Sequence, residues 1–342
     1  MNVKTYLVTG GLGFIGSNFI RHILTHQSHI GIVNLDKMTY AGNPVNLKEF
    51  EGHERYRFVK GDICDRDLVD DIFSRQKPAV VVNFAAESHV DRSIEDAAGF
   101  IKTDIEGVWN LLEKSRTYGL EKFIQISTDE VYGAITEGAA DENYPLKPSN
   151  PYSASKAGGD RLAFSYFVTY GMPVIVTRAS NNYGPFQYPE KLIPLFITNA
   201  LEDRKLPVYG DGRQRRDWLH VVDHCEAIQY IIEKGAEGET YNIAGNCEKV
   251  NLDVTEMILD ILKKPKDLIS YVKDRPGHDR RYSLDANKLF ALGWKPGRNF
   301  EEGLRETVEW YVKNDRWWRK IKSGEFREYY KKHYSWRLED KE

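Results

Sequence analysis

The sequence has few cysteines, few prolines and no long apolar run. Its three cysteines, Cys64, Cys225 and Cys247, are far apart and form no CxxC pair, which argues against a disulfide framework and a zinc site. Thirteen prolines in 342 residues are too few for a disordered linker protein. No stretch approaches the roughly 18 apolar residues of a membrane-spanning helix. The N-terminus shows no cleavable signal peptide, so we expect a cytoplasmic protein with no membrane partner.

The sequence also lacks an excess of charge of either sign. Lys and Arg number 48 against 51 Asp and Glu, a net charge of −3, so nothing global attracts a polyanion and we expect no nucleic-acid partner. His22, His26 and His29 could share a helix face, but no Glu or Cys ligand accompanies them. We interpret them as a solvated helix end and predict no metal.

Short β-branched runs alternate with helical patterns in the first half of the chain. At roughly 150 residues per domain, the length favours about two domains. The apolar face of Ile101, Ile105, Val108 and Leu112 indicates one of the helices. The strand runs are residues 6–8, 32–35, 80–84, 123–126 and 174–176. This alternation predicts an α/β fold with a Rossmann-type doubly wound parallel sheet. After about residue 180 the prolines become closer together and a smaller mixed α/β domain is expected.

A glycine-rich segment follows the first predicted strand and opens a helix. Gly10, Gly13 and Gly16 permit a tight turn and close approach of a pyrophosphate to the backbone. Asp36 ends the second strand, 20 residues beyond Gly16, where a carboxylate can bind ribose hydroxyls. A carboxylate repels a 2′-phosphate, which favours NAD over NADP, although Lys37 is adjacent. The alternative is a glycine turn with no ligand.

Tyr152 and Lys156 are four residues apart at a predicted helix start and share one face. An adjacent ammonium lowers a tyrosine pKa and allows the phenolate to act as a base. The spacing alone is weak, because other Tyr and Lys pairs in the chain repeat it. What distinguishes this pair is Thr128-Asp129-Glu130, at the carboxyl end of a predicted strand, where open sheets bind ligands. In isolation, the two carboxylates could equally be a solvated acidic turn.

These motifs together resemble the extended short-chain dehydrogenase/reductase superfamily. The consecutive Asp and Glu after the triad Thr narrow the resemblance to the nucleoside-diphosphate-glucose 4,6-dehydratases. Further similar stretches are residues 85–93, 180–185, 190–194, 216–219 and 274–282. One departure is the short segment between Gly133 and Pro148, where many bacterial members carry a longer loop. The resemblance therefore does not say how the active site closes.

The resemblance implies an NAD-dependent lyase that forms a 4-keto-6-deoxy sugar for deoxysugar biosynthesis. Tyr152, assisted by Thr128 and Lys156, would take the proton of the sugar 4-hydroxyl while hydride passes to NAD. Glu130 would remove the proton at carbon 5, and Asp129 would donate one to the departing 6-hydroxyl. The hydride then returns to carbon 6, so NAD is regenerated in each turnover and should be tightly bound.

The resemblance also assigns binding residues. Those expected to bind NAD are Gly10, Gly13, Phe14, Ile15, Gly16, Asp36, Lys37, Thr39, Asp62, Ile63, Ala86, Ser88, Thr103, Ser127, Tyr152, Lys156 and Asn182. Those expected to bind the nucleotide sugar are Ser88, Thr128, Asn181, Lys191, Pro207, Tyr209, Arg216, Asn251, Arg275, His278 and Tyr282. The cations among them would hold a diphosphate despite the negative total charge.

The same resemblance implies the domain organisation and leaves alternatives. Residues 1–180 would form the NAD-binding domain, with return segments near 222–246, and residues 181–342 mainly the nucleotide-sugar domain. A homodimer through the helices around 97–117 and 151–170 is expected. dTDP-glucose is the favoured substrate, with UDP- or CDP-glucose as alternatives. A nucleotide-sugar 4-epimerase or decarboxylase, or a catalytically silent cofactor-binding regulator, remains the competing interpretation.

Overall fold

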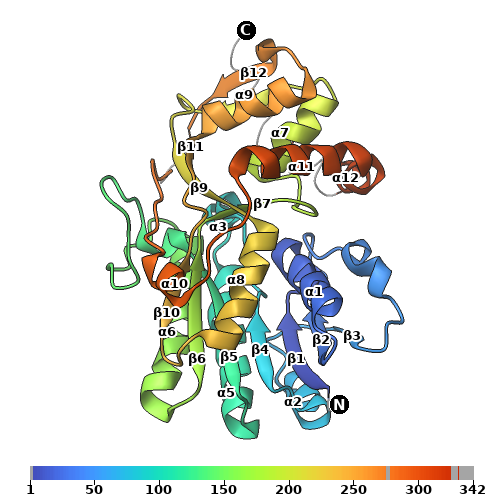
Figure 1. The fold of residues 1–342 in the computed structure, drawn as a ribbon, viewed down its shortest axis with the longest axis vertical. Helices are drawn as coiled ribbons and strands as arrows, with labels where there is room; N and C mark the ends of the chain where they lie inside the picture. Colours follow the sequence, from blue (N-terminus) through green and yellow to red (C-terminus); the bar gives the residue numbers. More distant parts are fainter. Residues whose placement is uncertain (1–2, 275–277, 325–329, 331–342) are drawn as a thin grey trace.

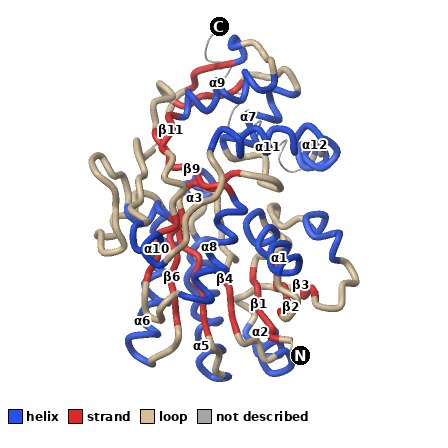
Figure 2. Tube along the Cα trace, viewed as in Figure 1, coloured by secondary structure: helices blue, strands red, loops and turns tan. Residues whose placement is uncertain are grey.

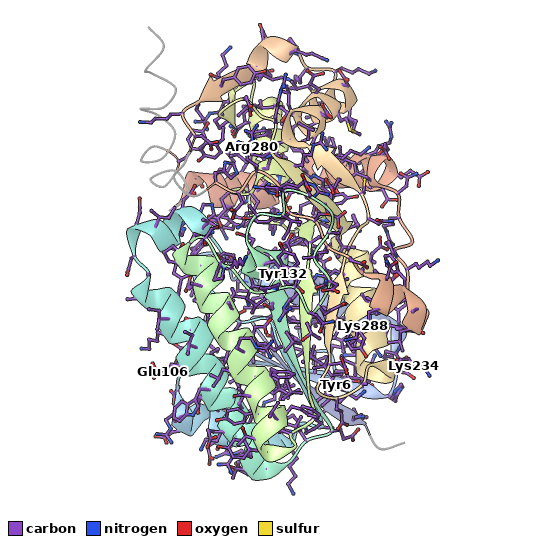
Figure 3. All side chains as sticks on the ribbon, turned by 90° about the vertical axis from the view of Figure 1, so that its left-hand side faces the viewer. Tyr6, Glu106, Tyr132, Lys234, Arg280 and Lys288 are labelled. Atoms are coloured by element: carbon purple, nitrogen blue, oxygen red, sulfur yellow. The ribbon has the colours of Figure 1, made fainter. Side chains whose placement is uncertain are left out.

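The computed structural model describes residues 3–274, 278–324 and 330. It has two lobes, a larger one built on a parallel sheet and a smaller one above it in Figure 1. Figure 2 shows the strands of the larger lobe between helices on both sides. Side chains fill the space between these layers in Figure 3, where Tyr6 lies in the lower lobe and Arg280 in the upper one.

Seven parallel strands form the sheet of the larger lobe, in the order β10-β6-β5-β4-β1-β2-β3. Their bounds are β1 (Lys4–Thr9), β2 (Ile30–Asp36), β3 (Tyr56–Lys60), β4 (Val80–Asn83), β5 (Lys122–Thr128), β6 (Val174–Ala179) and β10 (Thr240–Ile243). The central strands are mostly apolar and buried along most of their length because helices cover both faces. The strand order reverses between β1 and β4, and sheets of this kind bind ligands beyond the carboxyl ends at that point.

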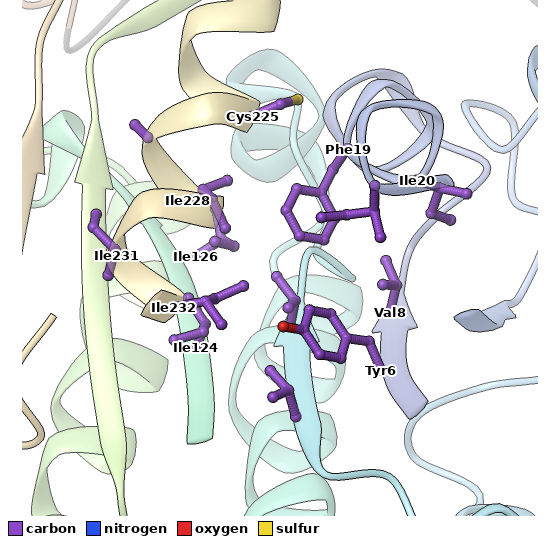
Figure 4. Close-up of a cluster of buried hydrophobic side chains, with 14 of the residues drawn as sticks. Tyr6, Val8, Phe19, Ile20, Ile124, Ile126, Cys225, Ile228, Ile231 and Ile232 are labelled. Atoms are coloured by element: carbon purple, nitrogen blue, oxygen red, sulfur yellow. The ribbon is translucent and has the colours of Figure 1, made fainter. Parts of the chain in front are cut away.

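Helices cover both faces of this sheet. They are α1 (Phe14–His26), α2 (Arg66–Gln76), α5 (Val108–Tyr118), α6 (Pro151–Tyr170) and α8 (Val221–Lys234). On one face, Phe19 and Ile20 of α1 and Ile228 of α8 belong to the same buried cluster as Tyr6 and Val8 (Figure 4). On the other face, α2, α5 and α6 contribute to a second buried cluster. Since α8 and β10 come late in the sequence, the chain returns to the larger lobe after crossing the smaller one.

The apolar face predicted from Ile101 to Leu112 is divided between the core and the surface. Val108 and Leu112 are fully buried, but Ile101 is 56% exposed. A π-helical turn, η2 (Lys102–Gly107), lies between α4 (Ala98–Ile101) and α5. The extra residue of a π turn rotates everything before it relative to a regular helix, so Ile101 leaves the buried face.

The smaller lobe is built from short strands and helices. One sheet has the order β11-β9-β7 and another pairs β12 with β8. The strands are β7 (Asn181–Tyr183), β8 (Leu206–Tyr209), β9 (Arg215–His220), β11 (Glu248–Val250) and β12 (Ile269–Val272). The helices are α7 (Leu192–Leu201), α9 (Asn251–Leu262), α11 (Phe300–Lys313) and α12 (Asp315–Ser323). A separate buried cluster that includes Phe196, Ile258 and Leu304 gives this lobe its own core.

Short helical pieces complete the described chain. They are η1 (Pro44–Phe50), α3 (Val90–Glu95), η3 (Asp129–Tyr132), η4 (Lys266–Leu268) and α10 (Asn287–Leu292). The short segment after Gly133 is not loose. Arg281 donates hydrogen bonds to the carbonyls of Ile135 and Gly138, and Ala140 forms a bridge with Leu284. The segment is therefore held against residues 281–284.

Candidate active site

The first strand ends in the glycine turn that opens α1. Gly10 has a φ of +67°, and a Cβ added to it would lie 2.7 Å from the backbone nitrogen of Ala85. A Cβ on Gly16 would lie 2.5 Å from the carbonyl oxygen of Gly10. Side chains are thus excluded where the turn must be tight. The N-cap Gly13 has no side-chain cap, and the first turn has no acidic residue, so this helix end is open to an anion.

Two carboxylates lie beside the turn. Asp36 is 7% exposed and accepts hydrogen bonds from the amides of Leu12 (2.9 Å) and Met38 (2.7 Å). Burial raises the pKa of Asp36. Asp62 pairs with Lys37, whose Nζ lies 2.7 Å from the Asp62 Oδ2. Because this partner balances the charge of Lys37, the turn and Asp36 fit a dinucleotide without a 2′-phosphate.

β5 ends in the hydroxyl of Thr128, and η3, which follows at once, begins with two carboxyl groups. The hydroxyl of Thr128 donates to the Asp129 Oδ1 at 3.0 Å and accepts from the amide of Glu130 at 3.3 Å. Asp129 is only 3% exposed. Burial, and then the charge of Glu130, raise the pKa of Asp129 to about 8. The site thus holds an Asp that can stay protonated at neutral pH.

α6 places a tyrosine and a lysine opposite these carboxyl groups. The helix starts sharply, because Asn150 caps the amide of Ser153 in a reciprocal capping box and Pro151 occupies the first turn. Tyr152 and Lys156 are both buried one turn apart. Lys156 Nζ donates to the carbonyl of Ile126 on β5 at 2.7 Å, which fixes the ammonium beside the strand that leads to the carboxylates.

The expectation that the lysine makes the tyrosine acidic is wrong for the chain by itself. Burial, and then the charges of Glu130, Asp104 and Asp129, raise the pKa of Tyr152 well above its ordinary value. Burial also lowers the pKa of Lys156. Burial of the phenol and the negative groups around it outweigh one ammonium, so a phenolate here needs a further positive charge close by.

The smaller lobe supplies cations and aromatic rings. Lys191 Nζ donates to the carbonyl of Ser88 at 2.6 Å and so reaches across to the larger lobe. The guanidinium of Arg216 lies 4.4 Å from the centre of the Tyr282 ring and donates to the carbonyl of Asp279 at 2.9 Å. These contacts orient a cation and a phenol for an anionic, ring-bearing ligand.

Every site residue predicted from the sequence lines one cavity between the lobes, apart from Arg275, which lies outside the described residues. Several buried polar atoms of this cavity have no hydrogen-bond partner among the described residues. They include Ser127 Oγ, Asp129 Oδ2, Glu130 Oε2, Asn181 Oδ1, Gln187 Oε1, Glu190 Oε2, Trp218 Nε1, His224 Nε2 and Asn251 Oδ1. Orphaned buried atoms are rare in proteins, so their concentration here fits a cavity shaped for a polar ligand.

The cavity also contains residues that the sequence analysis did not assign. Those with polar or charged side chains include Glu87, Gln187, Glu190, Gln214 and His224. The sequence offers one signal, since Glu87 and Glu190 fall inside the stretches that resemble the family. Within the described residues, no group of three or more His, Cys, Asp or Glu side chains could hold a metal ion. None of the helices that the structure describes is both long and apolar enough to cross a bilayer.

Comparison with known proteins identifies the family. A family model described as GDP-mannose 4,6 dehydratase matches residues 7–307. The dTDP-glucose 4,6-dehydratase of Streptomyces niveus is 52% identical over 322 residues, which cover 93% of this chain and 95% of that protein. This chain belongs to the dTDP-glucose 4,6-dehydratase family. The predicted family resemblance is thereby confirmed.

Solved structures of a dehydratase of this family and of an epimerase share the fold. A crystal structure of dTDP-glucose 4,6-dehydratase from Bacillus anthracis, in complex with NAD, is 50% identical, has a TM-score of 0.88 and covers 93% of this chain and 100% of that one. A UDP-glucose 4-epimerase from Thermotoga maritima, with UDP-glucose, is 31% identical, has a TM-score of 0.85 and covers 90% of this chain and 99% of that one. The predicted Rossmann-type α/β fold is confirmed.

Proposed function

We propose that this protein is an NAD-dependent lyase that converts dTDP-glucose to dTDP-4-keto-6-deoxy-glucose and water. The observation that carries the proposal is the pair Asp129 and Glu130, which line the same cavity as Thr128, Tyr152 and Lys156. Two relatives support it: one is 52% identical and named dTDP-glucose 4,6-dehydratase, and the other is 50% identical, has the same name and was crystallised with NAD. An epimerase needs the tyrosine and lysine but has no elimination step for two carboxyl groups to catalyse.

The glycine turn and Asp36 would hold the pyrophosphate and the adenosine ribose of NAD. The other expected cofactor residues line the same cavity. Bound NAD would accept a hydride from carbon 4 of the sugar and return it at carbon 6. Its oxidised nicotinamide is positively charged, which is the further positive charge that a phenolate at Tyr152 requires. Tyr152 would take the proton of the 4-hydroxyl, assisted by Thr128 and Lys156. The ammonium of Lys156 is held against β5 by its hydrogen bond to Ile126.

The two carboxyl groups would divide the elimination between them. A ketone at carbon 4 makes the hydrogen at carbon 5 acidic, and Glu130 would remove it. Asp129, whose pKa of about 8 keeps it protonated near neutral pH, would donate a proton to the 6-hydroxyl as it leaves as water. Adjacent residues can thus act as base and acid because their surroundings differ.

The smaller lobe would bind the nucleotide diphosphate. Lys191 and Arg216 are the cations that line the cavity from this lobe in the described chain. The remaining expected substrate residues that are described line the cavity too. For the domain organisation, we propose a division at residue 180, with α8 and β10 returning to the larger lobe. A cytoplasmic homodimer through residues 97–117 and 151–170 completes the proposal, and the exposed Ile101 and Val168 in these segments support it.

The test is to incubate the purified protein with dTDP-, UDP-, CDP- and GDP-glucose side by side without added NAD. We expect dTDP-glucose to give a product lighter by one water molecule, identified by mass spectrometry, with no consumption of external cofactor. An isomeric product of unchanged mass would instead identify an epimerase. Turnover of another nucleotide sugar alone would correct the base specificity, and no turnover of any would favour a silent cofactor-binding protein.

A further inference from the structure

Glu190 is a buried carboxylate to which the proposed chemistry gives no role. It lies in the segment that leads from β7 into α7, and its side chain is only 1% exposed. The next residue is Lys191, whose ammonium reaches the carbonyl of Ser88. Burying a charge without partners is unfavourable, so the contacts of Glu190 should account for its place there.

Three segments that are far apart in sequence meet at this carboxylate. The hydroxyl of Tyr40 donates to Glu190 Oε1 at 3.1 Å. The Nε of Arg92, on α3, forms an ion pair with Glu190 Oε2 at 3.8 Å, although this oxygen accepts no hydrogen bond from the described residues. The guanidinium of Arg92 also stacks on the Tyr40 ring, 3.7 Å from its centre, and Tyr188 packs edge-on against that ring. The carboxylate therefore joins the loop after β2, the helix after β4 and the approach to α7.

Each joined segment carries residues expected to bind a ligand. The loop after β2 contains Lys37 and Thr39 on the cofactor side of the cavity. α3 follows Ser88, and the approach to α7 carries Lys191 on the sugar side. A link between these segments holds the cofactor loop against the substrate half of the cavity. A cofactor that is reduced and reoxidised in each turnover has to be retained, which gives such a link a purpose.

We propose that Glu190 is a positioning residue that fastens the cofactor loop at Tyr40 to Arg92 and to the Lys191 segment, and so slows the release of NAD. The inference rests on the proposed function, because it takes NAD as the resident cofactor. Glu190 itself acts through Tyr40, Arg92 and Lys191.

The charge of Glu190 gives the link a pH dependence. Burial raises the pKa of Glu190 to about 7, against the lowering effects of Lys191 and Arg92. The hydroxyl of Tyr40 donates to it, and Asp91 on α3 adds a like charge. Below about pH 7 the carboxyl group is neutral, so its attraction to the two cations is lost. Release of NAD should therefore become faster as the pH falls through this value.

The experiment measures exchange of bound NAD for isotopically labelled NAD in the holoenzyme, without any sugar, from acidic to alkaline pH. Glu190→Gln keeps the shape and an acceptor for Tyr40 but removes the charge. We expect this variant to exchange NAD about tenfold faster than wild type above pH 7, as loss of a charged interaction implies, and with no pH dependence. Tyr40→Phe, which removes one hydrogen bond, should exchange faster by a smaller factor and keep the pH dependence.

Glu202→Gln is the matched control. Glu202 pairs with Lys322 at 2.6 Å in the smaller lobe and does not line the cavity, so its loss should leave the exchange rate at the wild-type value. Exchange at the wild-type rate in Glu190→Gln, or equal acceleration in Glu202→Gln, would overturn the proposal. If the wild type dehydrates dTDP-glucose but Glu190→Gln exchanges NAD at the wild-type rate, only the link is refuted. If the wild type is purified without bound nicotinamide, the link and the proposed function are refuted together.

Discussion

Asp129 and Glu130 carry the same functional group in different surroundings. Asp129 is 3% exposed and shares a hydrogen bond with Thr128, and its pKa rises to about 8. Burial and a neighbouring like charge are the two causes. At the scale of single residues, the chemistry is therefore set by where each carboxyl group lies, and two substitutions can separate the roles.

Glu130→Gln should stop the reaction after its first half. The substitution removes the proposed base for carbon 5 but leaves Thr128, Tyr152 and Lys156 in place. With dTDP-glucose, we expect the absorbance of reduced nicotinamide to rise and then persist, with product formation slowed by at least about a hundredfold. Glu137→Gln, an exposed carboxylate in the following segment, should behave as wild type. Full dehydration by Glu130→Gln would remove Glu130 from its assigned role.

Asp129→Asn should change the pH dependence of stability. In the folded chain Asp129 keeps its proton up to about pH 8, whereas an exposed Asp loses it near pH 4. Since only the unfolded state releases the proton in this interval, the contribution of Asp129 to stability falls as the pH rises from about 4 to about 8. The Tm of the variant relative to wild type should therefore climb through this range, by a few degrees, in thermal melts. A difference in Tm between variant and wild type that stays constant over this pH range would contradict a raised pKa at Asp129.

At the scale of elements, the catalytic helix depends on a close contact with the π turn. A Cβ on Gly159 of α6 would lie 2.3 Å from the carbonyl oxygen of Asp104 in η2. The same turn supplies the carboxylate of Asp104, which accepts from the hydroxyl of Ser155 at 2.6 Å and from the amide of Glu87 at 3.1 Å. The position of Lys156, next to Ser155, is thus determined by the packing of two helices.

Gly159→Ala should displace α6 and reduce activity. The added methyl group meets backbone, which has to move, so we expect a loss of about 1–3 kcal/mol in the free energy of unfolding. The reduction in kcat should be at least about tenfold, because small displacements of reacting groups are costly. Gly158→Ala is the control, since its Cβ would meet only the movable end of Ile105. Denaturant titration and steady-state kinetics would measure both, and wild-type kcat in Gly159→Ala would contradict this account.

The elements that the sequence predicts well are the ones with a local signal. Strands β1, β2, β4, β5 and β6 are apolar runs because both of their faces are buried. β3 (Tyr56–Lys60) was missed because it is an edge strand with mixed exposure and no apolar run. The π turn in η2 was missed because one extra residue in a helix leaves no mark in the periodicity. Ile101 is 56% exposed for that reason.

The residues of the candidate site also differ in whether a local sequence pattern reveals them. The glycine turn, Asp36 and the Tyr152 motif are short patterns whose chemistry depends on spacing, so they can be recognised from the sequence. Glu190 could not be assigned a role, because its partners Tyr40 and Arg92 are about 100 or more residues away. The direction of the Tyr152 pKa in the chain by itself was predicted wrongly, since it depends first on how deeply the fold buries the phenol and then on the carboxyl groups around it.

At the scale of the whole molecule, the net charge of −3 conceals opposite local charges. Cations of the smaller lobe face a cavity whose other wall carries Asp129 and Glu130. A ligand with a diphosphate at one end and neutral hydroxyls at the other suits this distribution, because each end meets groups it can bind. The lobes are joined at the cavity by such contacts as Lys191 with Ser88, so a bound ligand should stabilise the molecule as a unit.

Binding of dTDP should raise the Tm of the wild type, and Arg216→Met should abolish most of that increase. A ligand at a hundred times its Kd adds about 2.7 kcal/mol to the free energy of unfolding. Arg216 is buried beside Tyr282, and Met keeps much of its apolar stem while removing the charge. Arg213→Met, at an exposed position on the approach to β9, should leave the full increase. Thermal melts with and without dTDP measure both variants. Because the attraction is electrostatic, salt should reduce the increase in Tm of the wild type more than that of Arg216→Met. Equal increases in Tm in all three proteins would mean that the diphosphate binds elsewhere.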